Sequence, residues 1–195
     1  GANPFGSKNT SSLQFLAFGD WRTAVAFNDN GALEVGQLAT RLNLDLDLKL
    51  TGTERIHAFI RPLDKGGNFT RHEFSGDDRE SGTSFELDGN IETLFFEGDI
   101  GAIYSGFIDE HASFDLPVAL GLTPFIFQNG VWVEDAFTGG AITLAAKTSP
   151  ALNISNMDFT FFAGFDKVTT PAARDSLGGL NDDNNLNVFG IASFF

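Results

Sequence analysis

The sequence has no cysteine, one methionine and one tyrosine in 195 residues. Without cysteine the chain cannot form a disulfide, a thiolate metal site or a cysteine nucleophile, and its redox compartment stays undecided. It also lacks any run near the roughly 18 to 20 apolar residues that a membrane helix needs. With 12 Lys and Arg against 26 Asp and Glu, the net charge is -14. Because phosphate binding requires clustered basic residues, no nucleic-acid partner is expected.

Glycine and phenylalanine are abundant instead, with 22 residues of each. Together with frequent Asn and Asp, they favour strands joined by tight turns over packed helices. The length fits one domain, and no shift in composition divides it, so we expect a single all-β domain over residues 1–195. The start, GANPFG, lacks the basic and apolar regions of a signal peptide, and we interpret it as the start of a mature chain.

The strongest pattern runs from Arg41 to Leu50, where leucines alternate with charged or amide residues. A period of two places the leucines on one face of a strand and the polar residues on the other, whereas a helix would scatter both sets. With Leu38 and Thr40 included, the predicted strand is about 43 Å long, which exceeds most soluble strands. A membrane-spanning strand needs only about 9 to 11 residues.

A turn at Thr51–Glu54 follows, and alternation resumes from Arg55 to Arg61, which predicts a β-hairpin. The next segment, DKGGNFTRHEFSGDDRESGT at residues 64–83, is polar and rich in glycine and charge. We predict a long polar surface loop there.

Weaker alternation recurs along the chain and brings the expected number of strands to about eight, in up-and-down order. The segments concerned are 21–28, 85–88, 114–123, 139–147, 157–166 and 186–195. Turn clusters such as Asn28–Gly31 and Asn181–Asn185 separate them.

Alternation alone does not decide whether water or lipid covers the apolar face, because soluble sandwiches alternate too. The length of the leucine strand and the charges opposite its leucines favour a wet lumen. In a membrane every strand edge must be paired, so such a hairpin series closes into a barrel with apolar residues outward. With one Tyr and two Trp, any aromatic girdle has to consist of Phe. The sequence thus predicts a transmembrane antiparallel up-and-down β-barrel, with a soluble β-sandwich as the alternative.

Two segments carry a family resemblance: residues 115–147, DLPVALGLTPFIFQNGVWVEDAFTGGAITLAAK, and residues 156–166, NMDFTFFAGFD. They resemble bacterial outer-membrane porins of the alginate-export type, in which a strand ending in a Gly-Leu or Gly-Arg phrase leads into a loop and a strand of short residues follows. The resemblance is most specific from Gly121 to Asp135 and generic before Gly82. It implies the transmembrane barrel of a porin-like exporter or diffusion channel in the bacterial outer membrane.

The chain departs from that family in two ways. The family's lumen is strongly basic and carries a polyanion, whereas most inner positions expected here are acidic, so alginate is not the expected cargo. The family's barrels are also longer than this chain. This leaves open whether Phe195, on the same face as Phe189 and Ile191, is the terminal aromatic of a complete barrel or the end of the N-terminal part of a larger one.

The alternation divides the side chains of such a barrel into two sets. The expected pore-lining residues are Arg41, Asn43, Asp45, Asp47, Lys49, Arg55, His57, Arg61, Glu86, Asp88, Asp115, Asp158 and Asp166. The expected lipid-facing residues are Leu42, Leu44, Leu46, Leu48, Leu50, Phe159 and Phe161. Two roles, which can hold together, are expected for the basic residues of the two neighbouring strands. They orient polar solutes and set ion preference, and they pair with Asp45 and Asp47 across strands and stabilise the sheet. These residues are Arg41, Lys49, Arg55 and Arg61.

Catalytic and metal-binding patterns are missing from the sequence. The three histidines are far apart, and the acidic clusters at 77–80 and 182–183 lack EF-hand spacing, so no metal is expected. A glycosidase needs two carboxyl groups about 5 to 9.5 Å apart, and Asp45 and Asp47 lie on one face of a strand. Such pairs, however, occur on any amphipathic strand of this composition, so they do not indicate a glycosidase. The segment Gly98–Gly101 lacks the third glycine and the following helix of a dinucleotide loop. We expect no enzyme, no catalytic residue and no cofactor.

Three functions remain open. The first is a porin-like channel for diffusion or export of small hydrophilic solutes or saccharides, selected by pore width and lumen charge. The second is a soluble, secreted β-sandwich that binds a ligand such as a carbohydrate. The third is a non-conducting barrel that serves as a scaffold in the cell envelope. The expected partners are membrane lipid and small hydrophilic solutes, with a homo-oligomer or envelope proteins left open.

Overall fold

The computed structural model describes residues 3–32, 34–76, 82–127, 133–166, 168, 177–179 and 187–194. The chain divides into two compact units. Unit 1 contains Gly1–Leu16, Asp47–His57 and Thr93–Phe195, and unit 2 contains Ala17–Leu46 and Ala58–Glu92. The expectation of one barrel domain over residues 1–195 stays a prediction.

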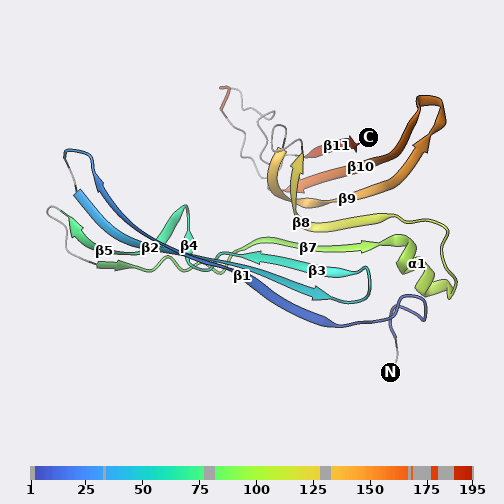
Figure 1. Ribbon diagram of the computed structural model, residues 1–195, viewed down its shortest axis with the longest axis horizontal. Coiled ribbons are helices and arrows are strands. Elements are labelled where there is room, and N and C mark those ends of the chain that lie inside the picture. The colour runs from blue at the N-terminus through green and yellow to red at the C-terminus, as the bar shows by residue number, and fades with distance from the viewer. Residues whose placement is uncertain are drawn as a thin grey trace. The chain divides into compact units, whose positions relative to one another are not determined.

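The fold is all-β and antiparallel, as the composition predicts (Figure 1). Its strands are β1 (Gln14–Asp29), β2 (Glu34–Lys49), β3 (Arg55–Ile60), β4 (Asp64–Lys65), β5 (Asn68–Gly76), β6 (Gly82–Ser84), β7 (Ile91–Asp99), β8 (Pro117–Phe127), β9 (Val133–Ser149), β10 (Ile154–Asp166) and β11 (Val188–Phe194). One α-helix, α1 (Ile100–Ile108), and one 3-10 helix, η2 (Pro150–Leu152), occur in the described ranges. No helix in those ranges is long and apolar enough to cross a membrane.

Strands β7 to β11 form a meander, in which each strand pairs with the next along the chain. In unit 2, β2 pairs with both β1 and β5, and β5 also pairs with β4 and β6. The hydrogen-bonding path of the sheet runs β11-β10-β9-β8-β7-β3-β2-β5-β4 and starts and ends on different strands. The described strands therefore form an open sheet, and the closed barrel expected from the sequence is not present among them.

The strongest sequence predictions are confirmed. Strand β2 contains four of the five alternating leucines, since it ends at Lys49, one residue before Leu50, and it extends the predicted strand towards the N-terminus. The predicted hairpin is present, since β3 begins at Arg55 and lies next to β2 in the sheet. Strands β1, β8, β9, β10 and β11 also coincide with alternating segments, although β8 begins at Pro117 and not at Phe114. The predicted turn at Asn181–Asn185 and the terminal Phe195 lie outside the described residues.

The sequence does not predict β7, and two further segments differ from the structure predicted for them. The polar segment 64–83, expected to be a loop, contains β4, β5 and the beginning of β6, because β5 pairs with the N-terminal part of β2. Residues 85–88, expected to be a strand, have no ladder partner among the described strands. The N–H of Glu86 donates to the Thr70 hydroxyl at 3.0 Å, and the N–H of Asp88 donates to the Pro62 carbonyl at 3.2 Å. These bonds replace those that a strand would make.

Helix α1 follows β7 directly, which corrects the expectation that no helix follows Gly98–Gly101. The Asp99 carboxylate caps the helix and accepts hydrogen bonds from the N–H groups of Ala102 and Leu116, both at 2.8 Å. An acidic N-cap satisfies helix donors that otherwise have no partner. The third glycine of a dinucleotide loop is still missing, so the helix does not restore that motif.

A small phenylalanine cluster forms the hydrophobic core of unit 1. The rings of Phe125 and Phe137 stack with 4.4 Å between their centroids, and Phe162 lies 5.6 Å from Phe125. Glycines make room for two of these rings. A Cβ added at Gly164 would lie 2.4 Å from the Phe137 ring, and one added at Gly190 would lie 2.2 Å from the ring of Phe162, its cross-strand partner. The abundance of Gly and Phe therefore has a packing role here, because an aromatic ring covers a glycine on the adjacent strand.

A buried carboxylate joins the N-terminal segment of unit 1 to the turn between β2 and β3. Glu54 is 1% exposed and accepts hydrogen bonds from Asn9 Nδ2 at 2.7 Å, from Thr53 Oγ1 at 2.6 Å and from Thr51 Oγ1. Burial by itself raises the pKa of the Glu54 carboxyl, but the hydrogen bonds lower it by more, and the pKa ends below its usual 4.5. Glu54 is therefore held as a carboxylate.

Candidate functional site

Unit 2 has a polar face and an apolar face, and the alternation of β2 defines both. The register of β2 with β5 places Ala39 opposite Arg71, so Arg71 and Arg41 project from the same side of the sheet. Leu42 and Leu44 project from the other side. We call the side that carries Arg41 the polar face of unit 2.

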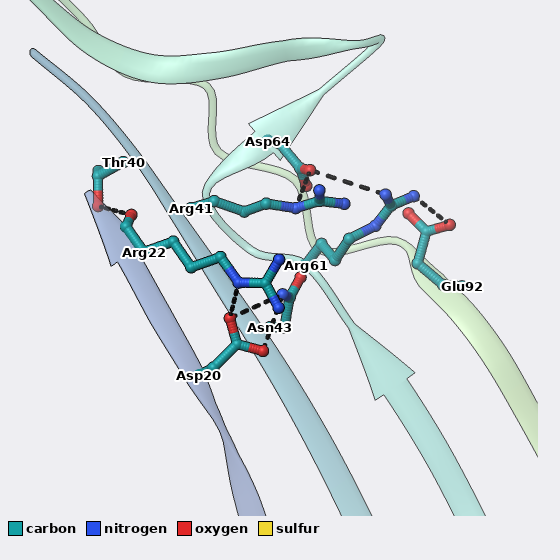
Figure 2. A network of polar contacts seen from close by, with 8 residues as sticks. All are labelled: Asp20, Arg22, Thr40, Arg41, Asn43, Arg61, Asp64 and Glu92. Carbon is teal, nitrogen blue, oxygen red and sulfur yellow. Dashed lines mark hydrogen bonds and ion pairs between the residues drawn. The ribbon is translucent and has the colours of Figure 1, made fainter. Parts of the chain in front are cut away.

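On this face Asp64 bridges two arginines (Figure 2). Its Oδ2 atom lies 3.3 Å from Arg41 Nε and 3.9 Å from Arg61 Nη1. Arg61 also pairs with Glu92, with 2.7 Å between Nη2 and Oε2. The Asp64 side chain is only 11% exposed, so water and salt screen its ion pairs less than those of a surface carboxylate.

A second group on the polar face centres on Asp20 of β1 (Figure 2). The Asn43 amide donates to both carboxylate oxygens of Asp20, at 3.1 and 3.2 Å, and Arg22 forms an ion pair with the same carboxylate. Asn43 is 9% exposed, and its Oδ1 atom has no hydrogen-bond partner among the described residues. A buried acceptor of this kind is usually satisfied by water or by a ligand.

Arg71 extends the ion pairs along β5. Its Nε lies 3.2 Å from Glu73 Oε1, and its Nη1 lies 3.7 Å from Glu86 Oε1. The guanidinium of Arg41 also lies over the Phe69 ring, 5.5 Å from its centroid. The polar face of unit 2 thus combines arginines and carboxylates in close alternation, which supplies both donors and acceptors.

The apolar face of unit 2 is exposed. Trp21, Val25 and Phe27 of β1 are 71%, 62% and 74% exposed. The Trp21 indole donates to the Thr40 hydroxyl, which places Trp21 on the side of β2 opposite Arg41. A strand of a soluble sheet that has paired charges on one face normally buries the other face in a core. Here the described residues leave these large side chains uncovered.

Unit 1 holds a separate polar cluster, which we call the His57 cluster and which consists of Asp47, Arg55, His57, Phe95 and Glu97. The His57 Nδ1 atom lies 3.9 Å from Asp47 Oδ1, and its Nε2 atom lies 3.5 Å from Glu97 Oε2. Arg55 Nη1 lies 3.3 Å from the other oxygen of Asp47. The Phe95 ring stacks on the imidazole with 4.9 Å between centroids. The imidazole is therefore fixed between two carboxylates.

The strands β7 to β11 of unit 1 have an exposed apolar face on the side opposite Glu97. Phe96 is paired with Leu120, and Phe161 is paired with Ile191, so these side chains lie on the side opposite Glu97. Leu120 is 55% exposed, Phe161 40%, Phe189 71% and Ile191 66%. Together with side chains of α1 they line an apolar hollow of about 890 Å³. Binding surfaces and membrane surfaces of proteins carry exposed apolar side chains gathered in this way.

The structure groups many of the predicted pore-lining residues. Arg41, Asn43, Arg61 and Glu86 lie on the polar face of unit 2, and Asp47, Arg55 and His57 lie in the His57 cluster. Asp45 and Lys49 share the polar side of β2 by alternation. That these residues line a pore stays a prediction.

Four predicted pore-lining residues belong neither to the polar face of unit 2 nor to the His57 cluster. Asp88 accepts hydrogen bonds from Asn90 in a turn, and Asp115 is exposed in the segment before β8. Asp158 accepts a hydrogen bond from the Ala146 N–H at 2.7 Å, and Asp166 ends β10. A role in a pore stays a prediction for these four residues as well.

The predicted lipid-facing residues keep the expected alternation. Leu42, Leu44, Leu46, Leu48 and Leu50 are all partly exposed, as is Phe159, and Phe161 is exposed. Phe159 and Phe161 share a face of β10, as residues two apart in a strand do. Contact of these side chains with lipid stays a prediction.

Sequence reasoning missed several residues of the polar face of unit 2 and of the His57 cluster. These are Asp20, Arg22, Asp64, Arg71, Glu73, Glu92 and Glu97. Asp20 and Arg22 carry a usable signal, because they alternate with Trp21 and Thr23. The others lie in the segment interpreted as a loop or at the two ends of the unpredicted β7.

The clusters offer ion pairing and hydrogen bonding to a solute. No group of three His, Cys, Asp or Glu residues in the described ranges is arranged to hold a metal ion, and the acidic segments 77–80 and 182–183 lie outside those ranges. In comparisons with known proteins, no family model, curated protein or solved structure matches the chain.

Proposed function

We propose that the chain forms part of the wall of a porin-like channel in the bacterial outer membrane, which passes small hydrophilic solutes or saccharides by diffusion or export. The observation that carries the proposal is the two-sided character of the sheet. In each unit, large exposed apolar side chains lie on one face, and the paired charges lie on the other face together with apolar side chains such as Phe69 and Phe162. A soluble sheet turns its apolar face towards a core, whereas a barrel in lipid turns it outward.

Strand length supports the same proposal. Strands β1 and β2 have 16 residues each, β9 has 17 and β10 has 13. A strand that crosses a bilayer needs about 9 to 11 residues, and most strands of soluble proteins are shorter than that. In lipid every strand edge must be paired, so the proposal requires pairing beyond the open path of the described strands.

The proposed channel selects solutes without covalent chemistry. Its lumen is lined by arginine and carboxylate groups that face each other at 2.7 to 3.9 Å, as Arg61 does with Glu92 and Asp64. Such groups orient dipolar solutes and replace part of the solutes' hydration. The net charge of the lumen lining sets the preference between cations and anions.

A second candidate is the soluble β-sandwich that binds a ligand, and the phenylalanine cluster favours it. Phe125, Phe137 and Phe162 are at most 6% exposed, as they would be in the dry interior of a sandwich. The exposed apolar side chains on the opposite face of the same strands count against it, because a sandwich leaves its outer faces polar.

Two adjacent residues of β2 separate the candidates. Leu44→Lys places a charge on the apolar face, and Asp45→Lys places the same charge on the polar face. A lysine facing lipid near the midplane of a barrel costs about 2 to 4 kcal/mol, whereas one in a wet lumen costs little. We expect Leu44→Lys to reduce insertion into lipid vesicles strongly and Asp45→Lys to insert like the unmodified protein. Insertion is measured by heat-modifiable migration on gels.

Conductance in planar bilayers tests transport itself. The purified protein, refolded in detergent, should give ohmic single-channel currents, and Asp45→Lys should shift the ion preference towards anions. A protein that stays a compact monomer without detergent and gives no current supports the sandwich. Heat-modifiable insertion with no current supports a scaffold barrel. Either result would overturn the proposed channel.

A further inference from the structure

The imidazole of His57 has an unusual hydrogen-bonding situation within the His57 cluster. Its Nδ1 faces Asp47 and its Nε2 faces Glu97, and stacking on Phe95 holds the plane of the ring between the two carboxylates. Among the described residues, His57 Nε2 and Asp47 Oδ1 are buried atoms without a hydrogen-bond partner. The ring is thus directed at two acceptors and bonded to neither.

The protonation state of the ring decides whether this arrangement is favourable. A neutral imidazole has one N–H and one lone pair, so it can donate to one carboxylate only and turns its lone pair towards the other. A protonated imidazole donates from both nitrogens and can satisfy both carboxylates at once. Gaps of 3.9 and 3.5 Å need to close by less than about 1 Å to reach hydrogen-bond distance.

The charged groups around the ring come from three strands. Asp47 and Lys49 lie on the polar side of β2, Arg55 lies beside His57 on β3, and Glu97 lies on β7. Arg55 already pairs with one oxygen of Asp47, at 3.3 Å, and leaves the other oxygen facing His57. Of the residue types in this cluster, histidine is the one whose charge proteins commonly use as a switch near neutral pH.

We infer that His57 is a proton-binding switch that sets the ion preference of the proposed channel, with protonation adding one positive charge to the channel wall and drawing Asp47 and Glu97 together. This inference rests on the proposed function. The protonated ring can donate both to Asp47 Oδ1, a buried acceptor without a partner among the described residues, and to the exposed carboxylate of Glu97. The lumen then attracts anions more strongly at acidic pH than at neutral pH.

The test is the reversal potential of the purified protein in planar bilayers under a potassium chloride gradient, at about pH 8 and about pH 5.5, which spans the range where histidine changes charge. We expect the reversal potential to move towards the chloride equilibrium potential at the lower pH. His57→Gln should abolish most of this shift. His57→Arg carries a permanent charge and should show the acidic ion preference at both pH values.

The matched control is His72→Gln. His72 lies on β5, where its Nδ1 is 2.9 Å from the Thr83 hydroxyl, and we expect its replacement to leave the pH shift unchanged. Heat-modifiable migration of each variant verifies folding before currents are compared. Currents that show the same pH shift in His57→Gln and in the unmodified protein overturn the inference and leave the channel intact. The absence of current from the folded, unmodified protein overturns the proposed channel and the inference with it.

Discussion

Among the described residues, unit 1 buries both large apolar and polar side chains, whereas unit 2 buries polar side chains. In unit 1, Phe137 is completely buried against Phe125 and Phe162. In unit 2, the buried side chains among the described residues are Asn43 and Thr70, both polar, and the large apolar side chains of β1 are exposed. Unit 1 therefore has a dry core, whereas unit 2 relies on hydrogen bonds and ion pairs along one face of its sheet.

This difference shows how one alternating pattern can serve two kinds of packing. Burial of an apolar side chain stabilises a fold by about 1.5 to 3 kcal/mol, whereas an ion pair that water still reaches contributes about 0 to 1 kcal/mol. Within unit 2, apolar burial thus contributes little to stability among the described residues. An apolar medium over Trp21 and Phe27 would add the stabilisation that comes from removing apolar side chains from water. Such a medium is what the proposed membrane location provides.

The largest expected effect is the loss of the unit 1 core. Phe137→Ala removes a ring that is 0% exposed and stacked on Phe125, and we expect the free energy of unfolding to fall by about 3 to 5 kcal/mol. Urea unfolding in detergent micelles measures it. Phe161→Ala is the matched control, because Phe161 is 40% exposed on the opposite face. Equal losses in the two variants would mean that the cluster is not the core of unit 1.

An intermediate effect is expected at Glu54. Glu54→Gln removes a buried charge that accepts three side-chain hydrogen bonds, and at neutral pH we expect a loss of about 1.5 to 3 kcal/mol. Because the pKa of Glu54 in the folded state lies below its usual 4.5, its contribution is complete above that pH and disappears as the pH falls through the lowered value.

The difference in unfolding free energy between Glu54→Gln and the unmodified protein should therefore shrink with acid. Unfolding curves at a series of pH values from neutral to acidic measure this. Glu110→Gln serves as the control, since Glu110 is exposed after α1 and should show no such trend. A difference that stays constant with pH would contradict the carboxylate role of Glu54.

The smallest effect is expected on the polar face of unit 2. Asp64→Asn keeps the shape of the side chain but removes the charge shared by Arg41 and Arg61, and we expect a loss of at most about 1 kcal/mol, reduced further by salt. Unfolding at low and high salt measures it. A loss as large as that of Phe137→Ala would show that unit 2 depends on its ion pairs as strongly as unit 1 depends on its core.

The sequence predicts strands well where apolar and polar residues alternate, because the two faces of the strand then differ clearly. The leucines of β2 alternate without interruption, and the strand and its hairpin with β3 are both present. It predicts poorly where partners are distant. Segment 68–76 is polar and Gly-flanked and yet forms β5. The residues it pairs with, at the beginning of β2, lie between 30 (Thr40 with Thr70) and 41 (Val35 with Gly76) residues earlier, and local sequence does not reveal such a pairing.

Apart from Glu86, the residues of the candidate site that could be predicted follow β2 and β3. Arg41, Asn43, Arg55 and His57 follow from alternation, but their partners Asp64 and Glu97 come from β4 and β7, which the pattern does not indicate. The cap that starts α1 was readable in principle, since Asp99 precedes an apolar run. The phenylalanine core was not, because Phe occurs on both faces of β10.

The most direct test of the account is the medium in contact with each face of the meander. The chain has no cysteine, so a single spin label can be attached at Phe161→Cys on the apolar face or at Glu97→Cys on the polar face without further changes. In lipid vesicles, the account predicts that the label at 161 is accessible to oxygen, which dissolves in lipid, and the label at 97 to a water-soluble nickel chelate. Equal access of the chelate to both labels would contradict it.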